Sequence, residues 1–148
     1  MTTLKMLDSR KMAFLFDMKL HYRKEKPPVT MDGKLGEYIG SGDGTLNGLR
    51  INGNVHWTLF EAQTETVCPA NLIGLITTDD NAEIKLDAIG FFMRPDPADP
   101  YRWVNSAAIR FVTADERYAW LNSILGVWRG ETDGRIWRHD IQVHAISA

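Results

Sequence analysis

The sequence predicts a single all-β domain, an antiparallel β-barrel with one short helix. Three observations lead to this expectation: long stretches alternate apolar and polar residues, turn-forming stretches separate them, and one capped segment has helical spacing. A chain of 148 residues suits one domain over residues 1–148, with residues 1–10 as a flexible N-terminal segment. A barrel is preferred to a sandwich because it removes exposed strand edges, and these strands carry few edge-guarding lysines.

Two long alternating stretches occupy the first half of the chain. The first has these residues on one face: Phe14, Phe16, Met18, Leu20 and Tyr22. The second has these: Leu49, Ile51, Gly53, Val55, Trp57 and Leu59. Lys26-Pro27-Pro28 should end the first strand, because proline cannot continue a ladder. Between the two stretches, Gly40-Ser41-Gly42-Asp43-Gly44 is interpreted as a turn or bulge.

The central segment predicts a hairpin. Leu72-Ile73-Gly74-Leu75-Ile76 is apolar on both faces, which is typical of a strand covered from both sides. Asp79-Asp80-Asn81 supplies residues that tolerate positive φ in a tight turn. The return strand alternates from residue 83 to residue 90, and a proline-broken surface loop follows at residues 94–100. Residues 107–112 are expected to form another strand.

The pattern becomes helical after this strand. Thr113-Ala114-Asp115-Glu116 is interpreted as a capping box, in which the Thr113 hydroxyl and the Glu116 carboxylate bind first-turn amides. The helix should carry Trp120, Leu121 and Ile124 on one face. Two last strands are expected near residues 125–129 and 135–144, with a turn at residues 132–134.

Composition excludes several classes of protein. The net charge of −2 gives no basic footprint for nucleic acid, and no apolar run approaches the ~20 residues that span a bilayer. Residues 12–16 are too short an apolar run for a signal peptide. The single cysteine, Cys68, excludes an internal disulfide, so a cytoplasmic location is expected. The four histidines lack metal-ligand spacing, and neither a metal nor any other cofactor is expected.

Aromatic residues are the most distinctive part of the composition. The chain holds 5 Trp, 6 Phe and 4 Tyr, which indicates either an aromatic core or an aromatic-lined pocket for a small apolar or aromatic ligand. The candidates for pocket walls are Tyr38, Trp57, Trp103, Trp120, Trp137 and His139.

Four further side chains are candidates for chemistry. His56 can transfer a proton near neutral pH, although a solvated histidine on a polar strand face is the simpler interpretation. Asp87 and Arg110 could act as a base and as an anion clamp, or as ordinary surface charges. Tyr118 could donate its phenol, or pack as part of an aromatic helix. His139, already among the pocket-wall candidates, shares a face with Trp137 and could line a lumen or be a bonded core histidine.

Three motifs resemble the domain-of-unknown-function family 3237. They are the glycine-spaced stretch Gly44–Val55, the hairpin Asp80–Ile84 followed by Gly90, and the block Tyr118-Ala119-Trp120-Leu121-Asn122 after Arg110-Phe111. The resemblance implies a small barrel of the allene-oxide-cyclase or lipocalin type, often assembled as a homo-oligomer. Barrels of this kind also serve cofactor-free cyclases and isomerases.

The chain departs from the family pattern at polar positions. His56 stands where the family has an aspartate after a longer loop, and Asn105-Ser106 stands where it has an arginine. Val112 replaces an acidic residue, and Asn81 replaces a glycine. The roles of the missing groups are therefore not transferred to this chain.

Two functional hypotheses follow, with a third as the structural alternative. The first is a cofactor-independent lyase or isomerase, cyclases included, that acts on a small aromatic or polyketide-like molecule in the lumen, with His56 and Arg110 as the first candidates for its chemistry. This assignment requires both side chains to face a cavity. The second is a carrier for an apolar ligand, and the third is a purely structural oligomer with a filled barrel.

Overall fold

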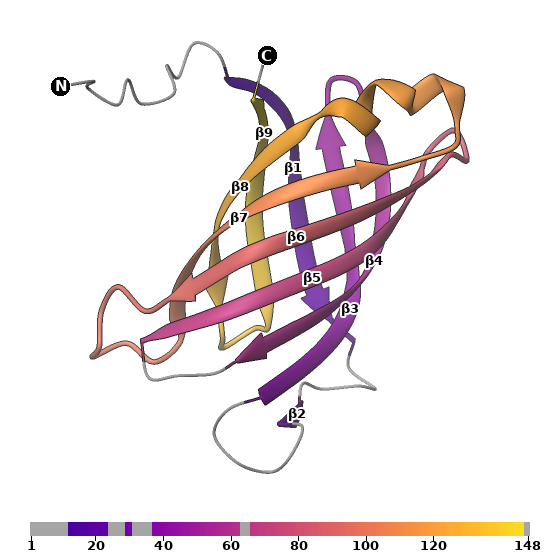
Figure 1. Ribbon diagram of the computed structural model, residues 1–148. Helices are drawn as coiled ribbons and strands as arrows, with labels where there is room; N and C mark the ends of the chain where they lie inside the picture. Colours follow the sequence, from indigo (N-terminus) through magenta and orange to yellow (C-terminus); the bar gives the residue numbers. More distant parts are fainter. Residues whose placement is uncertain (1–11, 24–28, 31–36, 63–65, 147–148) are drawn as a thin grey trace, which may run out of the picture.

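The fold is a closed antiparallel barrel, as the sequence predicts. The computed structural model describes residues 12–23, 29–30, 37–62 and 66–146, so the N-terminal segment predicted to be flexible and Lys26-Pro27-Pro28 lie outside the described residues (Figure 1). The strands are β1 (Met12–Tyr22), β2 (Val29–Thr30), β3 (Glu37–Gly48), β4 (Asn52–Ala62), β5 (Val67–Thr78), β6 (Glu83–Met93), β7 (Arg102–Val112), β8 (Leu125–Asp133) and β9 (Arg138–Ile146). One 3-10 helix, η2 (Glu116–Ser123), joins β7 to β8.

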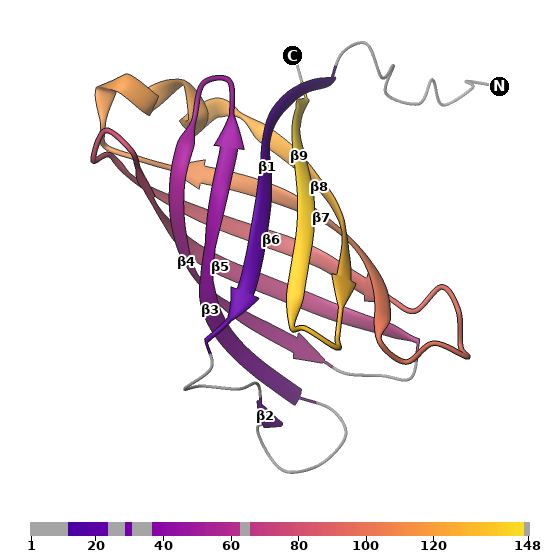
Figure 2. The same ribbon diagram turned by 180° about the vertical axis from the view of Figure 1, so that it is seen from behind.

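The strand order explains how the barrel closes. Neighbours follow the order β1-β9-β8-β7-β6-β5-β4-β3, and β1 also pairs with β3, which joins the two ends of the sheet. The short β2 extends the edge of β3 beyond β1, at residues Ile39 and Tyr38. Figure 2 shows β1 lying between β9 and β3 on the side where the sheet closes.

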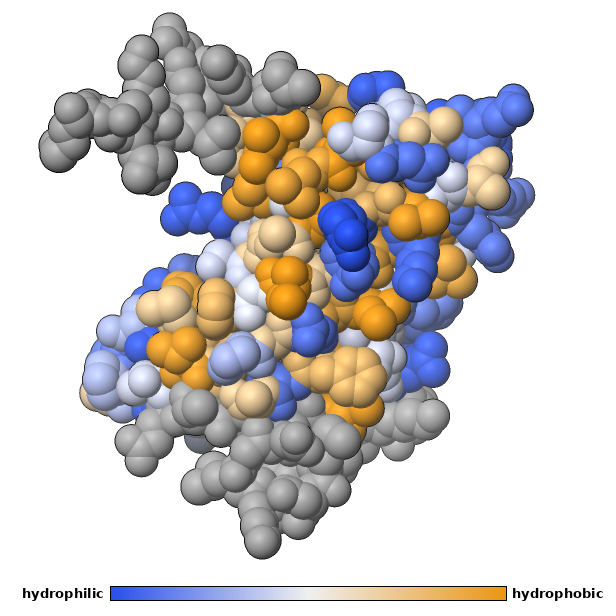
Figure 3. Space-filling model, in the orientation of Figure 1, coloured by the Kyte–Doolittle hydropathy of each residue, from blue (hydrophilic) through white to orange (hydrophobic). Residues whose placement is uncertain are grey.

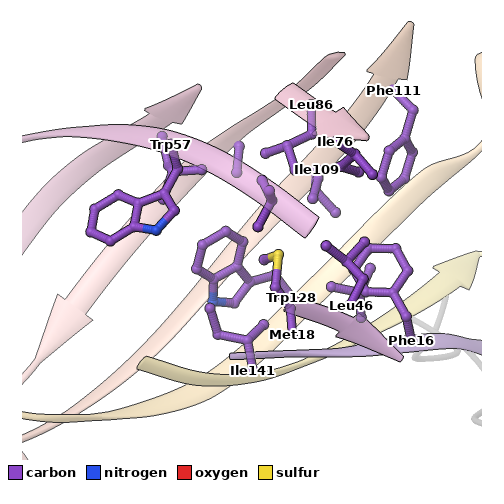
Figure 4. Close-up of a cluster of buried hydrophobic side chains, with 14 of the residues drawn as sticks. Phe16, Met18, Leu46, Trp57, Ile76, Leu86, Ile109, Phe111, Trp128 and Ile141 are labelled. Carbon is purple, nitrogen blue, oxygen red and sulfur yellow. The ribbon is translucent and has the colours of Figure 1, made fainter. Parts of the chain in front are cut away.

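Inward-facing side chains fill most of the barrel. Phe16, Met18, Val55, Ile109 and their neighbours on the same faces are fully buried, and they form one continuous apolar core. Within the cluster drawn in Figure 4, Trp57 lies at the end opposite Phe16 and Phe111, whose rings meet edge to face at 6.0 Å. Alternation therefore predicted the core, with local exceptions. A register shift between Phe14 and Phe16 leaves Phe14 exposed, and Leu49 is 92% exposed.

The helix closes one end of the barrel. Tyr118 and Leu121 are buried, and the Tyr118 hydroxyl donates to Asp80 Oδ1 at 2.8 Å. The predicted capping box is wrong in detail, because Asp115 caps the helix and accepts from the Arg117 amide. Thr113 instead donates its hydroxyl to the carbonyl of Glu83 at 2.7 Å, which ties the helix end to β6.

The glycine-rich run is regular strand, not the predicted turn or bulge. Residues 40–44 lie inside β3, where inward-facing glycines let the backbone of β1 approach closely. A Cβ on Gly42 would lie 1.9 Å from the carbonyl oxygen of His21, and one on Gly44 would lie 2.4 Å from that of Lys19. Glycine is thus required here by a close approach between strands and not by a turn.

The middle of β5 is covered on one side only, which corrects a second expectation. Leu72 and Ile76 are buried, whereas Ile73 and Leu75 point outward with exposures of 44% and 41%. Ile89 and Phe91 on β6 add further exposed apolar surface, and Figure 3 shows apolar side chains among charged ones on this face. The outer wall of the barrel is therefore partly apolar.

The last hairpin is displaced from its predicted position. Strand β8 continues to Asp133, and the turn covers residues 134–137, so β9 begins at Arg138. Trp137 has a φ of 53° in this turn, and Asn81 has a φ of 67° in the predicted turn between β5 and β6. A positive φ is unusual for a bulky side chain, so the Trp137 conformation must be held by its surroundings.

We expect Gly42→Ala to lower the free energy of unfolding by about 3 kcal/mol, because the added methyl group would meet backbone atoms of β1. Gly134→Ala is the matched control, since its Cβ would lie 3.3 Å from the nearest atom, a spacing that a small shift accommodates. Urea unfolding of both variants measures the difference. Equal stability of the two variants would contradict the packing argument.

Candidate functional site

A pocket of about 400 Å³ opens at the end of the barrel opposite the helix. It lies where β1, β4, β6 and β8 end and where β7 and β9 begin. Its lining is Tyr22, Glu61, Phe92, Arg94, Pro100, Tyr101, Trp103, Thr132, Gly134, Trp137 and His139. We call it the mouth pocket. Its size suits a small ligand, and aromatic walls with a few polar groups are typical of ligand sites.

A chain of hydrogen bonds runs from the core to this pocket. Trp128 donates from Nε1 to Asn105 Oδ1 at 2.6 Å, and Asn105 donates from Nδ2 to Thr132 Oγ1 at 2.9 Å. Thr132 Oγ1 lies 2.6 Å from His139 Nδ1, and His139 Nε2 lies 3.2 Å from the Tyr22 hydroxyl. Five side chains from β1, β7, β8 and β9 are therefore connected in one polar path.

His139 is neutral at physiological pH. Its imidazole is enclosed by the rings of Tyr22, Trp57 and Phe92, with centroids 5.4, 5.7 and 5.5 Å away. This burial lowers the pKa of His139 to about 4, and the nearby charge of Asp140 offsets the effect only in part. A neutral imidazole donates one hydrogen bond and accepts one, and it can therefore bind the hydroxyl groups of both Thr132 and Tyr22.

Glu61 is the ionisable group with a pKa near neutrality in the mouth pocket. It follows Trp57 and Leu59 on the inward face of β4, where alternation turns its carboxyl toward the lumen. Burial raises the pKa of the Glu61 carboxyl to about 7. At neutral pH it therefore exists in both forms, and it can give or take a proton.

Arg94 and Trp137 complete the rim of the pocket. The Arg94 guanidinium lies 5.7 Å from the Trp103 ring centroid, and its Nη2 donates to the carbonyl of Pro97 at 2.8 Å. The Trp137 ring meets that of Tyr22 edge to face at 5.5 Å. The unusual backbone conformation of Trp137 thus places a large aromatic ring against the end of the hydrogen-bonded chain.

The structure places the leading chemical candidates outside the barrel, which corrects their assignment to lumenal chemistry. The side chain of His56 is 61% exposed and pairs with Asp43, which also binds Arg23. Arg110 is 73% exposed and pairs with Asp87 at 3.2 Å. Odd and even positions of a strand face opposite sides, so these residues point away from the pocket while their apolar neighbours point in.

The remaining candidates divide between the two ends of the barrel. Trp103, Trp137 and His139 line the mouth pocket, and Trp57 packs behind it against His139. Tyr118 and Trp120 lie at the closed end, where Trp120 stacks under Arg50 with 3.7 Å between guanidinium and ring. The side chain of Tyr38 lies outside the described residues.

Sequence reasoning missed several groups of the mouth pocket, chiefly Tyr22, Glu61, Arg94 and Thr132. A signal was present for the first three. Each lies at the end of an apolar alternating face, so a polar or ionisable residue continues the inward register of a core strand. The register of β8 could not be read from the sequence, because its glycines interrupt the apolar pattern.

A larger hollow, of about 750 Å³, lies on the outer side of β1, β7, β8 and β9. Its charges are already paired in part, since Arg102 binds Glu131 and Arg138 binds Asp140 at 2.9 Å. Among the described residues, no aromatic side chain lines this hollow, whereas aromatic rings enclose the mouth pocket. The mouth pocket is therefore the stronger candidate.

Comparisons with known proteins support the fold. A β-barrel-like protein from Acinetobacter baumannii AYE is 17% identical, with 90% of this chain and 94% of that chain covered and a TM-score of 0.76. A conserved protein of unknown function from Rhodopseudomonas palustris is 19% identical, with 90% of this chain and 95% of that chain covered and a TM-score of 0.75. An enzyme from Penicillium herquei is 21% identical, with 90% of this chain and 92% of that chain covered and a TM-score of 0.62. No protein-family model and no curated protein matches the chain.

The fold and the pocket together define a class: a small closed barrel with an aromatic, polar-lined mouth at one end. Within the described ranges, no helix is long and apolar enough to cross a membrane. In the same part of the chain, no three His, Cys, Asp or Glu side chains are grouped as a metal site.

The burial of His139 predicts a pH-dependent stability. A histidine of the unfolded chain takes up a proton near pH 6.5, and the folded one does so only near pH 4, so the unfolded state binds more protons between these values. The contribution of neutral His139 is complete above pH 6.5 and is lost, by about 3 kcal/mol, as the pH falls toward 4.

His139→Gln should lack this loss. Glu61 acts in the opposite direction over part of this range, because its raised pKa favours the folded state at low pH, but it is common to both proteins. Urea unfolding of wild type and variant at several pH values measures the difference in stability. A difference that stays constant with pH would contradict the assignment of a buried neutral histidine.

Proposed function

We propose that the protein binds a small aromatic or polyketide-like molecule in the mouth pocket and catalyses a cofactor-independent isomerase, cyclase or lyase reaction on it. One observation carries the proposal: the pocket brings together Glu61, whose pKa lies near neutrality, and the hydrogen-bonded pair Tyr22 and His139 within aromatic walls. A pocket that served only to hold an apolar molecule would not need a titratable carboxyl in its wall.

The chemistry is a proton transfer. The Glu61 carboxylate takes a proton from a carbon next to a carbonyl group or from a hydroxyl group, and it returns that proton to another atom of the same molecule. A carboxyl with a pKa near the working pH is suited to both steps. The walls, which include Phe92 and Trp103, keep the ligand in one orientation and exclude water.

The similar structures are compatible with this proposal. The Penicillium herquei protein is an enzyme with a similar fold, and the similar protein from Rhodopseudomonas palustris is described as having an unknown function. Fold similarity at this level of sequence identity does not establish which reaction a protein catalyses, so the proposal depends on the residues of the mouth pocket. Membership of family 3237 stays a prediction.

The alternative function is that of a carrier. The aromatic walls support it, because Phe92, Trp103 and Trp137 would hold an apolar ligand without reacting with it. The two functions differ in the fate of the ligand, which an enzyme changes and a carrier releases unaltered.

The test begins with a thermal-shift screen of aromatic and phenolic metabolites, because a ligand of the folded state raises the melting temperature. With a ligand that wild type converts, Glu61→Gln should reduce turnover by at least about 100-fold and retain binding. For a base, wild-type kcat should rise with pH through the Glu61 pKa of about 7.

His56→Ala is the matched control, since it changes an outward-facing titratable residue of the same strand. It should bind and convert the ligand like wild type. Equal turnover by Glu61→Gln and wild type would remove Glu61 from the reaction. A ligand that wild type binds and releases unchanged would favour the carrier.

We also propose that the chain works as a cytoplasmic homo-oligomer. The supporting observation is the apolar outer wall, on which Ile89 is 65% exposed and Phe91 is 51% exposed, an arrangement typical of surfaces that associate. Ile89→Lys should lower the mass in sedimentation equilibrium without loss of the folded circular-dichroism spectrum. Equal masses for variant and wild type would place the contact elsewhere or exclude it.

A further inference from the structure

The turn between β8 and β9 places a tryptophan in a backbone conformation that usually belongs to glycine or asparagine. Trp137 has a φ of 53°, which brings the Cβ of an L residue close to its own backbone. In the turn between β5 and β6, a φ of 67° falls on Asn81, a residue type that tolerates it. Gly134 lies in the same turn as Trp137, yet it does not adopt the left-handed conformation. A bulky ring therefore occupies the strained position although a glycine is close by in the chain.

Packing into the core does not explain this tryptophan. Trp137 is 47% exposed, whereas Trp57 and Trp128 are 3% exposed and help to fill the barrel. The end of β1 holds the Trp137 backbone, because the Tyr22 amide donates to the Trp137 carbonyl at 3.3 Å. That contact needs no indole, and glycine would make it with less strain. The indole therefore acts at the surface that it faces, which is the mouth pocket.

The Trp137 ring keeps one face open. In the part of the chain that the structure describes, it meets the Tyr22 ring at 5.5 Å between centroids and an interplanar angle of 81°. A contact between perpendicular rings uses the edge of one and the face of the other, so it covers at most one of the two indole faces. Because Trp137 lines the mouth pocket and is about half exposed, its other face is available to a ligand there.

Two other aromatic side chains of the pocket already carry a cation against their rings. The Arg135 guanidinium lies 5.0 Å from the Tyr101 ring centroid, and the Arg94 guanidinium lies 5.7 Å from that of Trp103. A ligand would have to compete with these groups for a ring face. Trp137 is therefore better placed than either of them to stack on a flat ligand.

We propose that Trp137 determines the ligand specificity of the mouth pocket, and that the ligand is a planar aromatic molecule of at least two fused rings that stacks on its indole. The inference rests on the proposed function and deepens it, because it selects one shape within the class of small aromatic molecules.

The size and shape of the pocket agree with such a ligand. Two fused rings match the area of an indole, and a pocket of about 400 Å³ has room for them. Offset stacking requires a flat partner, so a saturated ring system of the same size loses the interaction. Because the turn holds the indole in place before the ligand arrives, less conformational entropy is lost on binding.

The experiment compares two probes, 2-naphthol and trans-2-decalol, which share two fused six-membered rings and one hydroxyl group but differ in planarity. Both are uncharged at neutral pH, and isothermal titration calorimetry measures their binding to the whole chain. Wild type should bind 2-naphthol at least about fivefold more tightly than trans-2-decalol, which is the effect expected of one stacked pair.

Trp137→Leu should make the two affinities equal, and Trp137→Phe should keep part of the preference because a smaller flat ring remains. Trp137→Gly removes the ring and relieves the backbone strain, so it tests the same loss in a turn that glycine accommodates. Trp103→Leu is the matched control in the same pocket, and it should weaken both probes alike and keep the preference.

Three results would overturn the proposal. They are equal binding of the two probes by wild type, a preference that survives in both Trp137→Leu and Trp137→Gly, and a loss of preference in Trp103→Leu as large as that in Trp137→Leu. A wild type that does not bind 2-naphthol would also overturn it. The screen of aromatic and phenolic metabolites would then still decide whether the protein has the proposed function.

Two further measurements separate stacking from a structural role. In ¹⁵N–¹H NMR spectra, the indole signal that is missing from Trp137→Phe should shift when 2-naphthol is added, and a signal that stays in place would contradict stacking. Trp137→Ala should have an unfolding equilibrium constant about fivefold larger than that of Trp137→Gly, as expected at a left-handed position. Equal constants would remove the strain on which the argument depends.

A failure of the proposed reaction has a different signature. If Glu61→Gln converted a ligand as fast as wild type, the catalytic role of Glu61 would be lost. The preference for 2-naphthol and the shift of the indole signal would remain, because neither measurement requires turnover.

Discussion

The structure depends on the close approach of β1 to β3, which closes the barrel. Gly42, Gly44 and Gly48 face inward on β3 at the positions where the backbone of β1 passes, and a side chain at any of them would meet a carbonyl oxygen of that strand. Closure joins both edges of the sheet and encloses the inward side chains. Without this contact the sheet would have two open edges, and the core residues of β1 would be exposed to water. The site depends on it too, since Tyr22 ends β1 and meets His139 of β9 and Trp57 of β4.

The two ends of the closed barrel have different chemistry. At one end the helix brings Tyr118 and Leu121 over the core, and the polar groups there bind one another, as Tyr118 does with Asp80. At the other end the inward faces continue into polar residues, and the apolar core lies directly beneath them. That proximity removes water from Glu61 and His139, and it shifts their pKa values in the directions that favour the neutral forms. The mouth pocket therefore brings a carboxyl with a raised pKa and a neutral, hydrogen-bonded imidazole to the same small space.

The ion pairs described below lie on the outer surface of the barrel, whereas the mouth pocket lies at its end. Arg110 with Asp87, Arg102 with Glu131 and Arg138 with Asp140 are exposed pairs, which contribute little individually because water screens them. The inward chain from Trp128 to Tyr22 contains no charge at all. Its members bind one another, so a polar path without a charged group crosses the inside of the barrel. The alternation that makes a strand amphipathic thus turns His56, Asp87 and Arg110 outward, where they cannot act on a ligand in the mouth pocket.

The sequence by itself determined the class of fold, the strand faces and most of the core, because period-two alternation records directly which side of a strand avoids water. It also indicated the aromatic residues near the site, of which Trp103, Trp137 and His139 do line the pocket. Only the tertiary structure decided which polar residues meet. Tyr22 and His139 are far apart in the sequence and adjacent only because β1 pairs with β9, and Thr132 reaches them through the pairing of β8 with β9. The glycines of β3 were misinterpreted for the same reason, since a glycine required by a neighbouring strand and one required by a turn look alike until the neighbour is known. A single strand specifies its faces, whereas a site is a property of the register between strands.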